Sequence, residues 1–292
     1  MLRQACQRQN NMVYLIKNDK TEIIINSLGA EVRSVVHNKK ERAWQNATGE
    51  WSGCAILLFP FAGFNHLIYD DVDFGVQKHG FCRNEEFEFV SKTDSIIEFK
   101  LLPNDRTKKV YPYEFEFYVR YTLIDDGYEV KYIIKNPTNG EIPISCGGHE
   151  SFALDEDVDR YYIEFEKNEN IDFQILNAHG FLTREVENHG EGRVLALEKS
   201  FTDNSATVAL ANINSRKVLL KSKNDDKLIV KIGFEGFDNL LLWHPHGAKM
   251  LCIEPWQCLP SYEGEIKEFK ERKGVIILSP FGEIEFTRTI TY

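Results

Sequence analysis

The chain has 292 residues, of which 42% are hydrophobic and 12% aromatic, and its formal net charge is -10 at pH 7. An acidic chain repels nucleic acid and anionic lipid, and no apolar run approaches the roughly 18 residues of a membrane-spanning helix. These totals argue against a nucleic-acid or membrane partner and favour a neutral small molecule. They leave the oligomeric state open.

The cysteines and the N-terminal segment bear on the compartment. The six cysteines, at positions 6, 54, 82, 146, 252 and 258, form no C-x-x-C pair, and their spacing predicts reduced thiols. Residues 1–11 are polar and contain no apolar segment typical of a secretory signal. We therefore expect a cytoplasmic protein, with residues 1–11 as a loose extension and residues 12–292 as a single domain.

Strand-like segments rich in aromatic and β-branched residues follow one another along the chain. In the strongest, residues 113–124 and 128–135 alternate with period two around Asp125-Asp126-Gly127, which predicts a hairpin. Only residues 262–273 and about 200–205 lack strand character. The other predicted strands cover residues 13–17, 22–26, 31–37, 87–90, 96–101, 161–166, 207–211, 217–221, 227–234, 239–243, 250–256, 275–278 and 283–291. This pattern predicts an all-β chain of large antiparallel sheets packed face to face.

Glycine lies beside chemically active side chains in segments that do not alternate as strands do. The first is Lys78-His79-Gly80-Phe81-Cys82-Arg83-Asn84. Its glycine frees the backbone, so His79 and Arg83 can reach one cleft and hydrogen-bond sugar hydroxyls or an anion. The alternative is a histidine and an arginine exposed at the surface.

The second segment is Ser145-Cys146-Gly147-Gly148-His149-Glu150-Ser151-Phe152, where an apolar run meets two glycines. Paired glycines allow a tight turn or a close approach to a ligand, and His149 can exchange a proton near neutral pH. A turn histidine bonded to a nearby carbonyl is the alternative. Glu150 either orients the imidazole or faces water.

The third segment is a predicted strand, residues 250–256, that holds a single carboxylate. Alternation places Cys252, Glu254 and Trp256 on one face, opposite two aliphatic residues directed to the core. Pro255 cannot donate to a ladder, so we expect the strand to end there and to leave Glu254 at a sheet margin. The alternative is a capped strand end beside a core tryptophan.

The sequence predicts neither a metal site nor a bound cofactor. His244 and His246 are two positions apart, but Pro245 interrupts the strand between them and no third ligand is near in sequence. The chain also contains no P-loop, dinucleotide fingerprint or G-x-S-x-G motif.

Taken together and in this order, these segments resemble the aldose 1-epimerase (galactose mutarotase) family, and most closely its LacX-type branch. The matching residues are Leu58-Phe59-Pro60, His79-Gly80-Phe81-Cys82-Arg83, Gly147-Gly148-His149-Glu150-Ser151-Phe152, and Cys252-Ile253-Glu254-Pro255-Trp256 followed by Leu259-Pro260. The resemblance implies a large antiparallel β-supersandwich. It also implies cofactor-independent interconversion of the α and β anomers of a free aldose.

The resemblance assigns roles to individual residues. His149 matches the general acid that protonates the ring oxygen, and Glu254 matches the general base at the C1 hydroxyl. A glutamate in a partly apolar setting should have a raised pKa, and its closeness should help keep the His149 imidazolium charged. The sugar-binding candidates are His79, Arg83, Trp256 and Asp238.

Two departures leave the substrate open. Galactose-specific members carry an arginine shortly after the Phe-Pro segment, whereas residues 61–66 contain none, so Arg83 or His66 is the candidate replacement. Arg83 also resembles a phosphate-binding arginine, which makes a hexose-6-phosphate mutarotase the first alternative. The second alternative is a non-catalytic carbohydrate-binding protein of the same fold.

Overall fold

Alternating burial organises the predicted hairpin in the computed structural model, which describes residues 11–47, 49, 51–199 and 207–292. Strand β10 (Glu116–Ile124) pairs antiparallel with β11 (Gly127–Lys135) around the Asp125-Asp126 turn, which confirms the prediction. Every second side chain of β10 is buried. The predicted start at residue 113 is wrong, because the strand begins at Glu116.

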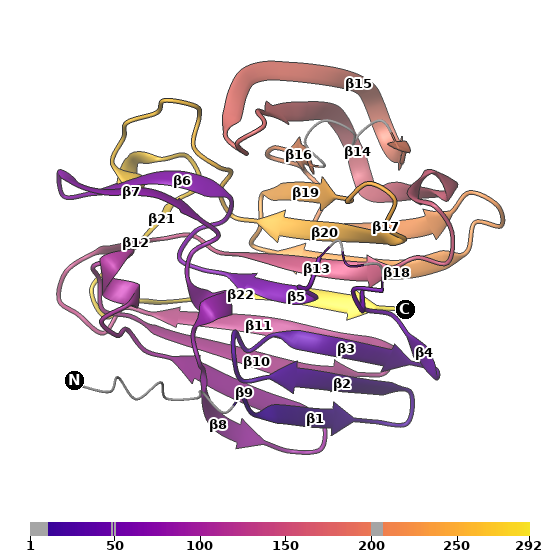
Figure 1. Cartoon of the computed structure of the whole chain (residues 1–292), viewed down its shortest axis with the longest axis horizontal. Helices are drawn as coiled ribbons and strands as arrows, with labels where there is room; N and C mark the ends of the chain where they lie inside the picture. The colour runs from indigo at the N-terminus through magenta and orange to yellow at the C-terminus, as the bar shows by residue number, and fades with distance from the viewer. Residues whose placement is uncertain (1–10, 48, 50, 200–206) are drawn as a thin grey trace, which may run out of the picture.

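The hairpin belongs to one continuous antiparallel sheet (Figure 1). Its first half runs, neighbour by neighbour, through β8, β9, β10, β11, β22, β18, β17 and β14, and its second half through β16, β19, β20, β13, β5, β3, β2 and β1. Strands β4 and β15 pair with β3 and β14, respectively. Two smaller sheets pair β12 with β21 and β6 with β7.

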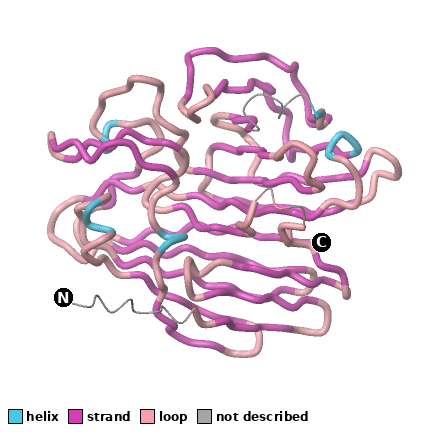
Figure 2. The backbone as a smooth tube through the Cα atoms, viewed as in Figure 1, coloured by secondary structure: helices cyan, strands magenta, loops and turns pink. Residues whose placement is uncertain are grey.

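The bounds of the remaining elements complete the description (Figure 2). The strands are β1 (Val13–Lys17), β2 (Thr21–Asn26), β3 (Val32–His37), β4 (Lys40–Glu41), β5 (Ala55–Leu58), β6 (Phe64–Tyr69), β7 (Val72–Lys78), β8 (Glu88–Lys92), β9 (Ile96–Leu101), β12 (Ile142–Ile144), β13 (Gly147–Ala153), β14 (Tyr161–Leu176), β15 (Leu182–Ala196), β16 (Thr207–Leu210), β17 (Lys217–Ser222), β18 (Leu228–Glu235), β19 (Asn239–Trp243), β20 (Met250–Trp256), β21 (Ile276–Leu278) and β22 (Glu283–Thr291). Short 3-10 turns occupy η1 (Cys82–Asn84), η2 (Thr107–Lys109), η3 (Val158–Arg160) and η5 (Phe269–Glu271).

The two ends of the sheet meet, so the sheet folds over itself into two layers. Tyr14 of β1 stacks on Phe89 of β8 with ring centroids 5.2 Å apart. Between the layers lies one large apolar core, to which aromatic side chains such as Phe99, Phe117 and Tyr132 contribute. The predicted all-β architecture is confirmed, with both layers formed by one sheet rather than by two separate sheets.

Two predicted segments differ from the structure near the middle of the sheet. Residues 147–153, expected to form an irregular turn, make strand β13 between β5 and β20. Strand β20 does not end at Pro255 but continues through Trp256, with Leu240 of β19 opposite the proline. The missing N–H is tolerated because the β13–β20 register pairs Gly147 with Trp256 and resumes only at Glu150 with Ile253. Glu254 therefore lies inside the sheet, not at its margin.

The remaining expectations concern segments without regular structure. Residues 262–273 form no strand, as predicted, and contain the 3-10 turn η5. Residues 1–10 of the predicted extension and the predicted non-strand segment 200–205 lie outside the described residues. Within the described chain, no helix has the length and apolar character needed to cross a membrane.

A buried ion pair links the two layers behind β13. Arg288 of β22 lies 2.9 Å from a carboxylate oxygen of Glu150 and is 1% exposed. Its Nη2 donates to the Tyr132 hydroxyl, 2.6 Å away, and its guanidinium lies over that ring. A buried charge of this kind is tolerated because its partner and hydrogen bonds replace water.

We predict that Arg288→Met lowers the free energy of unfolding by about 3–5 kcal/mol, because it leaves the Glu150 carboxylate buried without its partner. The double variant Arg288→Met/Glu150→Gln should lose clearly less of its free energy of unfolding, since both charges are gone. Lys131→Met is the control. Lys131 forms an ion pair with Glu285, which lies on β22 as Arg288 does, but this pair is partly exposed. It should contribute about 1 kcal/mol or less to the free energy of unfolding. Urea unfolding midpoints measure all three; equal losses for single and double variants would contradict the prediction.

Candidate active site

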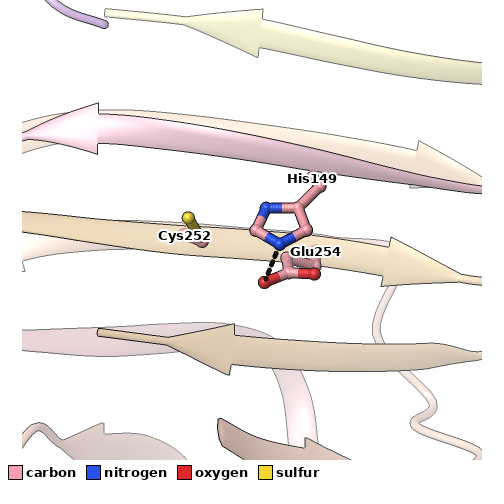
Figure 3. Close-up of side chains that lie close together, drawn as sticks. All are labelled: His149, Cys252 and Glu254. Atoms are coloured by element: carbon pink, nitrogen blue, oxygen red, sulfur yellow. Dashed lines mark ion pairs between the residues drawn. The ribbon is translucent and has the colours of Figure 1, made fainter. Parts of the chain in front are cut away.

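Neighbouring strands bring the two predicted catalytic side chains together. The β13–β20 register pairs Gly147 with Trp256 and Glu150 with Ile253, which brings His149 of β13 beside Glu254 of β20. His149 Nε2 lies 3.4 Å from Glu254 Oε1 (Figure 3). Both side chains are buried, with 7% of His149 and 2% of Glu254 exposed. The pair lies on the face of β20 opposite Leu251 and Ile253, which belong to the main core, as the alternation predicts.

The two glycines before His149 serve packing rather than a turn. A Cβ on Gly147 would come within 2.8 Å of the Trp256 ring, and a Cβ on Gly148 would overlap the Arg288 guanidinium. Both residues lie in extended strand β13. The sequence predicted a tight turn or a close approach to a ligand, whereas the groups that approach these glycines are side chains of the protein itself.

A cavity of about 660 Å³ opens beside His149 and Glu254. Five of the six site residues predicted from sequence line it: His79, Arg83, His149, Glu254 and Trp256. Three segments that are remote in sequence therefore converge on one cavity.

Asp238 is not part of this cavity, so its assignment as a sugar-binding residue is corrected. It lines a second cavity and lies 2.8 Å from the Arg216 guanidinium in an ion pair. His66 does not replace the missing arginine either, because its Nε2 lies 3.0 Å from Asp73 on the strand paired with its own. Arg83 does line the cavity.

His79 reaches the cavity through an unusual backbone conformation. Its φ is +63°, in the left-handed region, and the following Gly80 packs so closely on the Phe59 carbonyl that a side chain there would overlap it. The Nδ1 of His79 accepts a hydrogen bond from the Gly63 N–H at 3.0 Å. Burial lowers the pKa of His79 well below its usual value, so the neutral ring carries its proton on Nε2.

Aromatic rings enclose the His149 imidazole. Trp51 stacks on it with ring centroids 4.6 Å apart, and Trp243 and His79 meet it edge-on at 5.9 and 5.7 Å. Sequence reasoning missed Trp51 and Trp243 as site residues, because neither belongs to the three candidate segments. The aromatic enclosure also explains why so little water reaches the imidazole.

Burial shifts the pKa values of His149 and Glu254 in opposite directions. It lowers the pKa of His149 to about 3, and it raises the pKa of Glu254 well above its usual value, with the Glu150 charge adding to this rise. The expected direction for Glu254 is therefore supported. The expected charged imidazolium is not, because loss of water outweighs the attraction of the carboxylate.

Two cations share the cavity with the pair. Lys78 and Arg83 both line it, and burial lowers the pKa of each. Neither forms an ion pair with a carboxylate in the described part of the chain, although Lys78 Nζ lies 4.8 Å from the Phe64 ring centroid. Lys78 is the first residue of the segment that contains His79 and Arg83, but only those two were predicted to be site residues.

The described residues also contain one group of possible metal donors. The ligand atoms of His149, Cys252 and Glu254 all lie within 4.8 Å of one another. The histidine pair noted in the sequence is different, because His244 is buried and its Nδ1 lies 2.7 Å from the Met250 carbonyl oxygen.

Comparisons with known proteins agree with this fold. The chain is 28% identical over 282 residues to the chromosomal Protein LacX of Lactococcus lactis subsp. lactis, covering 89% of this chain and 93% of that protein. A galactose mutarotase-like protein from Lactobacillus casei ATCC 334 superposes with a TM-score of 0.89 at 26% identity, covering 96% of this chain and 99% of the other.

Two further structures extend the likeness in fold. A galactose mutarotase related enzyme from Lactobacillus acidophilus has a TM-score of 0.86 at 24% identity, covering 96% of this chain and 97% of that chain. The galactose 1-epimerase from Lactobacillus acidophilus NCFM has a TM-score of 0.70 at 14% identity, covering 96% and 93%. The sequence profile described as Aldose 1-epimerase matches residues 12–262. The chain therefore belongs to the aldose 1-epimerase family.

Proposed function

We propose that this protein interconverts the α and β anomers of an aldose, with His149 and Glu254 as the proton-transferring pair. The observation that carries this proposal is their 3.4 Å contact inside a cavity large enough for a sugar. Ring opening requires one group to give a proton while another takes one, and two ionisable side chains at one position meet that requirement.

In this mechanism the pair holds one proton. The raised pKa of Glu254 and the lowered pKa of His149 favour the Glu254 carboxyl as the resting position of that proton. Its transfer to His149 creates the acid and the base. His149 then protonates the ring oxygen while Glu254 takes the C1 hydroxyl proton, and the bond between C1 and the ring oxygen breaks to give an aldehyde. Rotation about the C1–C2 bond and the reverse transfers give the other anomer.

The walls of the cavity supply groups that suit a sugar. The Nε2–H of His79 is available to donate to a ring or hydroxyl oxygen, since Nδ1 already accepts from the backbone. Trp51 and Trp256 line the same cavity and offer apolar ring surface to the C–H face of a pyranose. Their contacts with His149 and His79 also hold both imidazoles in place.

We predict that Glu254→Gln slows anomer exchange about 10²- to 10⁴-fold, because the amide cannot accept the C1 proton. Exchange between the α and β signals of glucose and galactose, measured by NMR magnetisation transfer, gives the rate. Asp238→Asn is the matched control, since this carboxylate lies outside the cavity, and its rate should equal that of the wild type.

An unchanged rate in folded Glu254→Gln would overturn the catalytic assignment. Wild-type protein that binds a sugar without accelerating exchange would identify a non-catalytic carbohydrate-binding protein instead. The thermal unfolding midpoint of each variant separates loss of catalysis from loss of folding.

A second candidate function is anomer exchange of a phosphorylated aldose. Lys78 and Arg83 both line the cavity, with Glu254 as its one carboxylate among the described residues. Two cations that have no carboxylate partner among the described residues are an arrangement that stabilises an anionic substituent. Lys78, from the same sequence segment as Arg83, supplies the second cation.

We predict that Arg83→Gln lowers kcat/KM for glucose 6-phosphate by roughly 10- to 100-fold, because it removes a charge-assisted hydrogen bond. Its kcat/KM for glucose should change much less. Arg184→Gln, an exposed arginine outside the cavity, should leave both values unchanged. Equal losses for the two sugars in Arg83→Gln would reject a phosphate-binding role and leave the epimerase proposal intact.

A further inference from the structure

A thiol lies beside the proton-transferring pair and has no role in the proposed reaction. Cys252 is two residues before Glu254 on β20, so its side chain lies on the same face of the strand. Figure 3 shows its sulfur beside the imidazole of His149. An imidazole, a carboxylate and a thiol thus share one small volume.

We propose that His149, Cys252 and Glu254 form a binding site for a borderline divalent cation such as Zn²⁺, and that the occupied site does not catalyse anomer exchange. The inhibition of anomer exchange rests on the proposed function, whereas the binding of the cation does not.

The distances suit a metal ion. The three ligand atoms lie within 4.8 Å of one another, so some point lies no more than that distance divided by √3, or about 2.8 Å, from all three. Zinc bonds are about 2.0–2.3 Å long to nitrogen, oxygen and sulfur. Side-chain movements of about 0.5–0.8 Å therefore complete the coordination without a change in the strands.

The donor set selects the kind of cation. A neutral imidazole, a carboxylate and a thiolate together balance the charge of a divalent ion, which keeps a fully buried site close to neutral. Thiolate and imidazole favour zinc and its neighbours in the transition series, whereas magnesium and calcium require oxygen ligands. Three protein ligands beside an open cavity leave a fourth position for water or a ligand.

Two of the three donor side chains have no other partner in the described part of the chain that competes with a metal ion. The Nδ1 of His149 is buried and has no hydrogen-bond partner among the described residues, and Cys252 is a free, buried cysteine. Lys78 and Arg83 line the same cavity and weaken cation binding, so binding should depend strongly on the thiolate. Metal bonds to His149 and Glu254 would use the lone pairs that the proton transfers need.

Cobalt provides a readout that does not depend on activity. Protein freed of metal with a chelator is titrated with Co²⁺, whose thiolate complex absorbs by charge transfer in the near ultraviolet, and Zn²⁺ is measured by equilibrium dialysis. We expect the wild type to bind one equivalent of Co²⁺ and to show the thiolate-to-cobalt charge-transfer band. Cys252→Ser should lose the band and bind Zn²⁺ at least about tenfold more weakly.

Cys258→Ser is the matched control, because this second buried cysteine of the same segment contacts the Ser145 hydroxyl instead. It should bind both metals as the wild type does. If Cys252→Ser fails to fold, His149→Gln provides the second test, with the same loss of cobalt binding expected.

Absence of Zn²⁺ binding at millimolar concentration, or binding undiminished in folded Cys252→Ser, would overturn the site. Zn²⁺ should slow anomer exchange in the wild type and Cys258→Ser but much less in Cys252→Ser. Zn²⁺ that binds without slowing anomer exchange would reject the proposed inhibition and leave the metal site itself in place. Protein that binds cobalt through Cys252 but never exchanges anomers would instead reject the proposed function and keep the metal site.

Discussion

The buried ion pair between Arg288 and Glu150 is the constraint on which the site depends. It ties β22 in one layer to β13 in the other, and the guanidinium occupies the space where a side chain on Gly148 would lie. Because neighbouring strand residues point to opposite faces, fixing Glu150 towards Arg288 directs His149 towards the cavity. The same carboxylate also raises the pKa of Glu254, so a scaffold charge influences the chemistry.

The sequence revealed those features that depend on local pattern. Strict alternation identified the β10–β11 hairpin, and glycine beside histidine identified two cavity-lining segments. Strand β13 escaped detection because nearly all of its residues are buried, which removes the period-two signal. The continuation of β20 through Pro255 depends on gaps in a neighbouring ladder, and such gaps are a property of the assembled sheet rather than of the proline.

Long-range contacts explain the remaining differences. Trp51 and Lys78 line a cavity that forms only where segments remote in sequence meet, and this meeting cannot be read from the residues next to either one. Asp238 lies close in sequence to strand β19, yet its ion pair with Arg216 holds it at another cavity. The expected positive charge on His149 is not supported for a related reason. The sequence shows an acidic neighbour, but not the rings that keep water away.

The placement of His149 and Glu254 on directly adjacent strands has a consequence for how such a site diversifies. Their separation follows from the fixed spacing of hydrogen-bonded strands, about 4.7–4.9 Å, and not from the conformation of any loop. The segments that carry Trp51, Arg83 and the cavity wall at residues 177–181 lie outside regular strands. Insertions and substitutions in those segments can therefore reshape the cavity while the separation of His149 and Glu254 stays the same, so evolution can vary specificity and the proposed proton transfer separately.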